Sequence, residues 1–145
     1  MKKILAMVLG VFLCATVFGA TLDEGIAAHQ KGDYQTAAKI LRELAEEGEA
    51  MAQFILGGMY SDGKGLAQDH GEAFFWMTLA IKRASTADLQ AFIGKCLDLT
   101  STKLTQEKRD EIQARCTKWE EEFSKKHPAC PAGAHQHEDG HQHDE

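Results

Sequence analysis

The feature that most constrains the fold is a helical spacing of apolar residues, which runs from residue 22 to residue 125 with no alternating strand pattern beside it. The chain has only two prolines, Pro128 and Pro131, so this stretch lacks the residue that breaks helices most strongly. It is also rich in Ala, Leu, Glu, Lys and Gln, which are good helix formers. The sequence therefore predicts an all-α domain.

Glycines and polar turns divide this stretch into six short helices. Gly32 and Gly48 are expected to end the first two, because glycine readily adopts the positive φ found at a helix end. Gly63 and Gly65 lie in the polar loop after the third helix and suit a turn in the same way. The expected helices begin near residues 22, 34, 50, 70, 86 and 106.

Side chains that can cap helices stand before several of these segments. Asp69 is followed three residues later by Glu72, and Ser85 by Asp88, which fits the reciprocal capping arrangement at a helix start. The expected caps are Asp33, Asp69, Ser85 and Thr105. The fifth helix is expected to bury Leu89, Phe92, Ile93, Cys96 and Leu97, and the sixth Ile112, Cys116, Trp119 and Phe123.

The central segment AMAQFILGGMYSDGKGLAQDHGEAFFWMTLA resembles a Sel-1-like repeat, a sub-type of the tetratricopeptide-like helical repeats. The stretch before it, KGDYQTAAKILRELAEEGEAMAQ, resembles the back half of an earlier repeat, and LTQEKRDEIQARCTKW resembles the closing helix that often follows such repeats. The matching positions of the central repeat are Ala52, Leu56, Gly57, Tyr60, Gly63, Gly65, Asp69, Ala73, Trp76 and Ala80.

This resemblance implies a fold and a role. The fold would be a short α-solenoid of antiparallel helix pairs over residues 21–126, closed by a C-terminal helix pair at 86–125. The role would be protein–protein contact as an adaptor, with no chemistry of its own. Met51, Phe54 and Met59 are candidates for an apolar contact surface, although core packing is the better interpretation of each.

No catalytic pattern stands out in the chain. The glycines near Lys64 lack the spacing of a phosphate-binding loop. The acidic runs at residues 46–49 and 120–122 are typical of solvated helix surfaces, and His29 and His70 stand alone near helix ends. The sequence therefore predicts a protein that is not an enzyme.

The first twenty residues have the pattern of a cleaved export signal. Lys2 and Lys3 precede the apolar run Ile4–Phe18, and small residues follow at Gly19 and Ala20. An uncleaved membrane anchor is the alternative, and a lipid on Cys14 is less favoured. Removing the two lysines changes the net charge from −6 to −8, so nucleic acid and anionic membranes are poor partners. We expect a periplasmic or secreted bacterial protein with no membrane contact after cleavage.

Three cysteines would remain after cleavage: Cys96, Cys116 and Cys130. An oxidising compartment permits one disulfide among them and leaves one thiol over. A Cys96–Cys116 bond is disfavoured, because the expected hairpin would separate the two residues by about 12 Å along the helix axes. The pairing stays open at this point, and Cys130 could equally be a metal ligand.

The C-terminal segment, residues 127–145, predicts metal binding. It holds five of the seven histidines, four acidic residues and no Lys or Arg, and it lacks the apolar residues needed for a core. Neutral imidazoles suit Zn²⁺, Ni²⁺ and Cu²⁺, and nearby carboxylates raise the local negative potential. No cofactor is required by this pattern. The expected ligands are His135, His137, His141 and His143, joined by Cys130 and His127.

Two functions are compatible with these features. The first is an exported repeat scaffold that binds an unknown protein and carries a metal-binding tail. The second is a periplasmic metal buffer or metallochaperone, in which the tail is the working site and the repeats recognise a client. A hydrophilic tail whose histidines are incidental is the third interpretation of residues 127–145.

Overall fold

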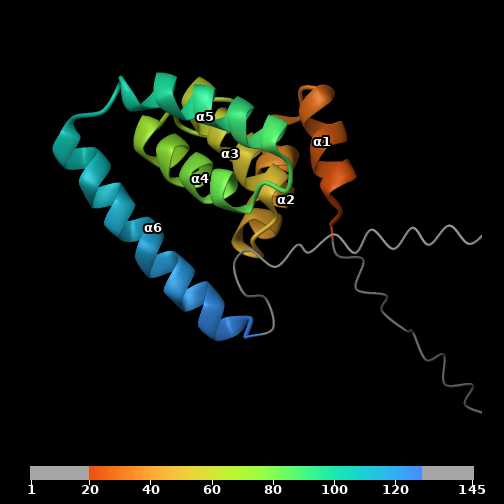
Figure 1. The fold of residues 1–145 in the computed structure, drawn as a ribbon. Helices are drawn as coiled ribbons and strands as arrows, with labels where there is room; N and C mark the ends of the chain where they lie inside the picture. Colours follow the sequence, from red (N-terminus) through yellow and green to blue (C-terminus); the bar gives the residue numbers. More distant parts are fainter. Residues whose placement is uncertain (1–19, 129–145) are drawn as a thin grey trace, which may run out of the picture.

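The computed structural model describes residues 20–128, and this range contains six α-helices and no strand (Figure 1). The predicted all-α class is therefore confirmed for the described residues, as are the six helical segments. The helices are α1 (Leu22–Gln30), α2 (Tyr34–Glu46), α3 (Ala50–Asp62), α4 (His70–Arg83), α5 (Ala87–Ser101) and α6 (Gln106–Lys126). None of them is long and apolar enough to cross a membrane.

The helices pack in chain order from α1 to α4, and the last two helices both contact α4. α3 and α4 make the most extensive contact, while α1 packs on α2 and α2 on α3. Both α5 and α6 pack on α4 (Figure 1). The predicted closing pair of α5 and α6 is therefore wrong, because these two helices barely touch each other and each packs on α4 instead.

The position of α4 explains its sequence. It is apolar on nearly every side, and its residues from Ala73 to Ala80 are all buried. A helix that is apolar all round belongs inside the packing of its neighbours. On one side α4 shares a cluster with α2, α3 and α6 that includes Leu41 and Leu56, and on the other it shares a smaller cluster with Ile93 of α5.

A glycine sets the distance between α3 and α4. A Cβ added to Gly57 would lie 2.9 Å from Met77 Cγ and 3.1 Å from the carbonyl oxygen of Ala73. The neighbouring Gly58 faces open space, with nothing within 4 Å of the same position. Gly57 therefore permits the close approach that small residues allow between helices.

The helix caps confirm most of the predicted starts. The side chains of Asp33, Asp69 and Thr105 each accept hydrogen bonds from backbone N–H groups in the first turn of the following helix. The cap of α5 is Thr86 and not Ser85, since it is the Thr86 hydroxyl that accepts from the Leu89 N–H at 3.3 Å. Both residues can cap, and the helix begins one residue later than the spacing to Asp88 indicated.

One further expectation about α5 is corrected, whereas its cysteine follows the sequence argument, which disfavoured a Cys96–Cys116 bond. Phe92, predicted to be buried, is 56% exposed and contacts the edge of Phe54 with ring centroids 5.6 Å apart. Cys96 and Cys116 are free thiols that lie in the two different clusters, so no disulfide joins them. Both results agree with the few contacts between α5 and α6.

Candidate functional site: a groove along α6

The predicted metal ligands fall mostly beyond the described part of the chain. Cys130, His135, His137, His141 and His143 lie outside the described residues. His127 is exposed at the end of α6, where its ring stacks on Phe123 with centroids 4.5 Å apart. Within residues 20–128 no group of three or more His, Cys, Asp or Glu side chains is placed to hold a metal ion.

A groove runs along α6 on the described surface. It encloses a volume of about 450 Å³ between α6, α4 and the end of α2. Aromatic rings and charged groups share its lining, which consists of Glu46, Phe75, Trp76, Arg115, Lys118, Trp119, Glu122 and Lys126. The chain has only two tryptophans, so both of them line this groove.

The end of α6 is held against the rest of the fold by an aromatic stack. Trp119 and Phe123 stack with centroids 4.9 Å apart, and His127 continues the series one turn later. Gly48, in the turn between α2 and α3, lies under the Phe123 ring, because a Cβ built there would be 2.6 Å from Phe123 Cζ. The positive φ of 89° at Gly48 is a second reason for glycine at this position.

Arg83 of α4 supports the same stack from the side. Its guanidinium carbon lies 4.8 Å from the Trp119 ring centroid and 4.9 Å from that of Phe123. Desolvation lowers the pKa of Arg83, although the nearby Glu120 carboxylate opposes the shift. The cation and the rings together fix the course of α6 beside α4.

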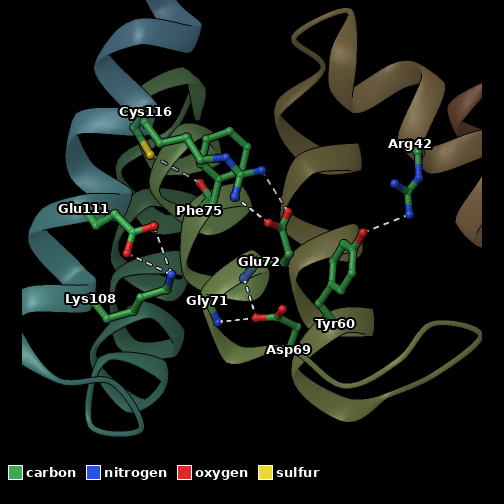
Figure 2. Close-up of polar contacts among 10 residues, drawn as sticks. Arg42, Tyr60, Asp69, Gly71, Glu72, Phe75, Lys108, Glu111 and Cys116 are labelled. Atoms are coloured by element: carbon green, nitrogen blue, oxygen red, sulfur yellow. Dashed lines mark hydrogen bonds and ion pairs between the residues drawn. The ribbon is translucent and has the colours of Figure 1, made fainter.

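Arg115 connects α6 to α4 at the far end of the groove. Its guanidinium carbon lies 3.9 Å from the centroid of the Phe75 ring, and the guanidinium forms a bidentate ion pair with Glu72. The hydrogen bond that Arg115 donates to the Glu72 carboxylate raises the pKa of Arg115. Figure 2 shows Glu72 directed toward α6, while Asp69 caps the helix start through the Gly71 N–H. Glu72 therefore links two helices and does not complete the predicted capping box.

Next to this ion pair, Cys116 is sealed in the interface between α6 and α4. Its thiol is fully buried and donates to the Phe75 carbonyl oxygen at 3.8 Å (Figure 2). Burial raises the pKa of the Cys116 thiol to about 11. The thiol therefore stays protonated near neutral pH and acts as a packing group, because only the thiolate is a good nucleophile.

Several polar groups of the groove have no partner within the described residues. Lys118 and Lys126 make no ion pair there, in contrast to Arg115. The indole N–H of Trp76 is buried without a hydrogen-bond acceptor. Buried donors are normally satisfied, so this indole N–H is an exception among the buried polar groups of the fold.

The other residues that the sequence singled out have structural roles. Glu49 accepts from the Met51 N–H and caps α3, and Glu120 pairs with Lys82 at 3.1 Å. His29 packs against the ring of Tyr34. Met59 is fully buried and Phe54 is partly buried against the smaller cluster, so the described fold uses both for packing.

Sequence reasoning missed Arg115 and Lys118 as site residues. The signal is present, because positions 115, 118, 119, 122 and 126 share one face of a helix at three- and four-residue spacing. That face is charged except for Trp119, so it looks like an ordinary solvated surface in the sequence. Its importance comes from α2 and α4, which lie opposite and turn it into a groove.

Comparisons of the chain with protein-family models, curated proteins and solved structures gave no match.

Proposed function

We propose that residues 21–126 form a short α-solenoid scaffold which, after export, holds an extended segment of a partner protein in the groove along α6, without enzymatic activity. The groove is the observation that carries this proposal, because it combines aromatic surface with polar groups that lack partners. Resemblance of residues 50–80 to a Sel-1-like repeat adds support, since such repeats bind proteins.

The lining of the groove indicates the kind of segment that would fit. Trp119 offers a partly exposed ring for apolar side chains, and aromatic residues supply much of the energy at protein interfaces. Lys118 and Lys126 offer ammonium groups that have no ion pair within residues 20–128. The preferred ligand is therefore a peptide that alternates apolar and acidic residues.

Metal binding by residues 127–145 is the second part of the proposal. The support is the concentration of five of seven histidines in this segment. In the scaffold interpretation the metal modifies the scaffold, whereas in the buffer or metallochaperone interpretation the metal is the cargo. The two differ in whether groove variants change delivery of the metal or only binding of the partner.

The test is position-specific photo-crosslinking in the native host. A benzophenone amino acid replaces Lys118 in the groove, and the matched control carries the same group at Lys39, an exposed lysine of α2 outside the groove. We expect one protein to be linked from position 118 and not from position 39. A partner linked equally from both positions, or from neither, would contradict the groove as the binding site.

A further inference from the structure

We propose that the acidic C-terminal segment of this chain, residues 129–145, docks back into the groove along α6 and competes with the partner for it. This inference rests on the groove of the proposed function and names a second occupant of it. Three features of the described residues and the sequence carry it: where the chain leaves α6, the charges on both sides, and the length of the segment.

The chain leaves α6 at one end of the groove. A smaller hollow adjoins the main groove and shares four of its lining residues. Trp119, Phe123 and His127 are among the residues that line this hollow. The stack of His127 on Phe123 fixes the backbone at this point. Residues after Pro128 therefore start beside the groove.

The charges are complementary. Residues 129–145 contain Glu138, Asp139, Asp144 and Glu145 and no Lys or Arg. Arg115 is already paired with Glu72, so the cations that the groove still offers are the ammonium groups of Lys118 and Lys126, which have no ion pair within residues 20–128. An acidic peptide is attracted to such a patch.

The length of the segment also fits. Lys118 lies ten residues before Pro128, or about 15 Å along the helix. Glu138 lies ten residues after Pro128, and a peptide of that length has a root-mean-square span of about 17 Å. Arg115 lies about 20 Å before Pro128 along the helix. The peptide from Pro128 to Asp144 has a root-mean-square span of about 22 Å. A tether whose mean span matches the distance gives the highest effective concentration, about millimolar.

The docked segment would complete the groove chemically. Its carboxylates would pair with Lys118 and Lys126, which have no ion pair within residues 20–128. The contacts are few and exposed, so docking would be weak enough for a partner to displace the segment.

The test is zero-length carbodiimide crosslinking of the full chain, followed by peptide mapping. This reagent joins a carboxylate to an amine only when the two are in contact. Lys118 is compared with Lys125, an exposed lysine that is nearer to the segment along the chain but does not line the groove. We expect links from the four acids to Lys118 to exceed links to Lys125 at least about fivefold, a ratio equivalent to about 1 kcal/mol.

A second measurement uses the two groove tryptophans. In a variant with Glu138→Gln, Asp139→Asn, Asp144→Asn and Glu145→Gln, we expect acrylamide to quench tryptophan fluorescence more strongly than in the unaltered chain, since the docked segment would shield Trp119. Links that favour Lys125, links found only between two copies of the chain, or unchanged quenching would each overturn the inference.

These outcomes are independent of the photo-crosslinking test. A partner captured at position 118 without any tail link leaves the proposed function in place and removes this inference. Tail links at Lys118 without a captured partner leave the docking in place and remove the partner. The two proposals therefore fail separately.

Discussion

The neighbouring glycines of α3 offer the sharpest test of how the described fold is packed. Gly57 and Gly58 stand side by side in one helix, yet an added methyl group would meet Met77 and the Ala73 carbonyl at Gly57 and nothing at Gly58. Alanine at either position removes the same backbone freedom from the unfolded chain. The pair therefore separates the close approach of α3 and α4 from helix propensity.

The magnitudes follow from these contacts. Gly58→Ala should raise the free energy of unfolding by about 0.8 kcal/mol, the usual gain for alanine over glycine within a helix. Gly57→Ala has the same gain but must push Met77 and the α4 backbone aside, and overpacking of this kind costs about 1–3 kcal/mol. Gly57→Ala should thus lie below Gly58→Ala by about 1–3 kcal/mol.

Urea titration followed by circular dichroism measures both variants against the unaltered chain. Equal slopes with denaturant would show that only stability has changed. In thermal unfolding, Gly58→Ala should raise Tm by about 3–6 °C. If Gly57→Ala were as stable as Gly58→Ala, then α3 and α4 would not approach each other at Gly57, and the packing argument would be wrong.

Three further predictions follow from the groove and its surroundings. Because burial raises the pKa of Cys116 from 9.0 to about 11, its contribution to stability is complete below pH 9 and is lost as pH rises toward 11. Urea unfolding at pH 8 and pH 10.5 should therefore show a loss of about 2 kcal/mol that a Cys116→Ala variant lacks, and equal losses would contradict the assignment. Glu72→Gln and Arg115→Gln should show a coupling energy of about 0.5–1 kcal/mol in a double-mutant cycle, because the pair is half exposed, and strict additivity would refute the link between α4 and α6. Zn²⁺, Ni²⁺ or Cu²⁺ titrated calorimetrically into the full chain should bind at sub-micromolar level and more weakly below pH about 6.5, and replacing the four histidines of residues 135–143 by asparagine should abolish this, whereas retained binding would place the metal elsewhere.

The helices could be predicted because their signals are local. Capping residues such as Asp33 and Thr105 act on the first turn of their own helix, and glycines such as Gly48 act at one backbone position. The single displaced cap, Thr86 in place of Ser85, reflects two neighbouring residues with the same capability. These interactions depend on a few adjacent residues, which the sequence displays directly.

The course of α6 could not be predicted in the same way. The apolar positions Ile112 and Cys116 indicated that one face would be buried, but they did not specify whether it would lie on α5 or α4. The choice depends on residues distant in sequence, notably Gly48 beneath Phe123 and Arg83 beside Trp119. Each of these contacts joins side chains that no local pattern relates.

The groove is a consequence of that choice. If α6 packed on α5 as a closing pair, Arg115 would be removed from Phe75 and Glu72, and Lys118 would belong to an ordinary solvated surface. Packing on α4 instead places the charged face of α6 opposite aromatic rings. It also places His127, at the end of α6, beside the groove. The candidate site therefore depends on tertiary packing even though its residues follow a simple helical spacing.

The two proposed activities of the chain meet at this point, and charge determines how they would influence each other. Residues 129–145 carry four carboxylates, and each bound divalent ion would offset two of those negative charges. Metal loading would then weaken attraction of the segment to Lys118 and Lys126 and make the groove more accessible to a partner. By linkage, a partner that occupies the groove would equally favour the metal-bound segment. A metal buffer with an independent client site requires no such coupling, so the effect of metal on groove occupancy separates the scaffold interpretation from its rival.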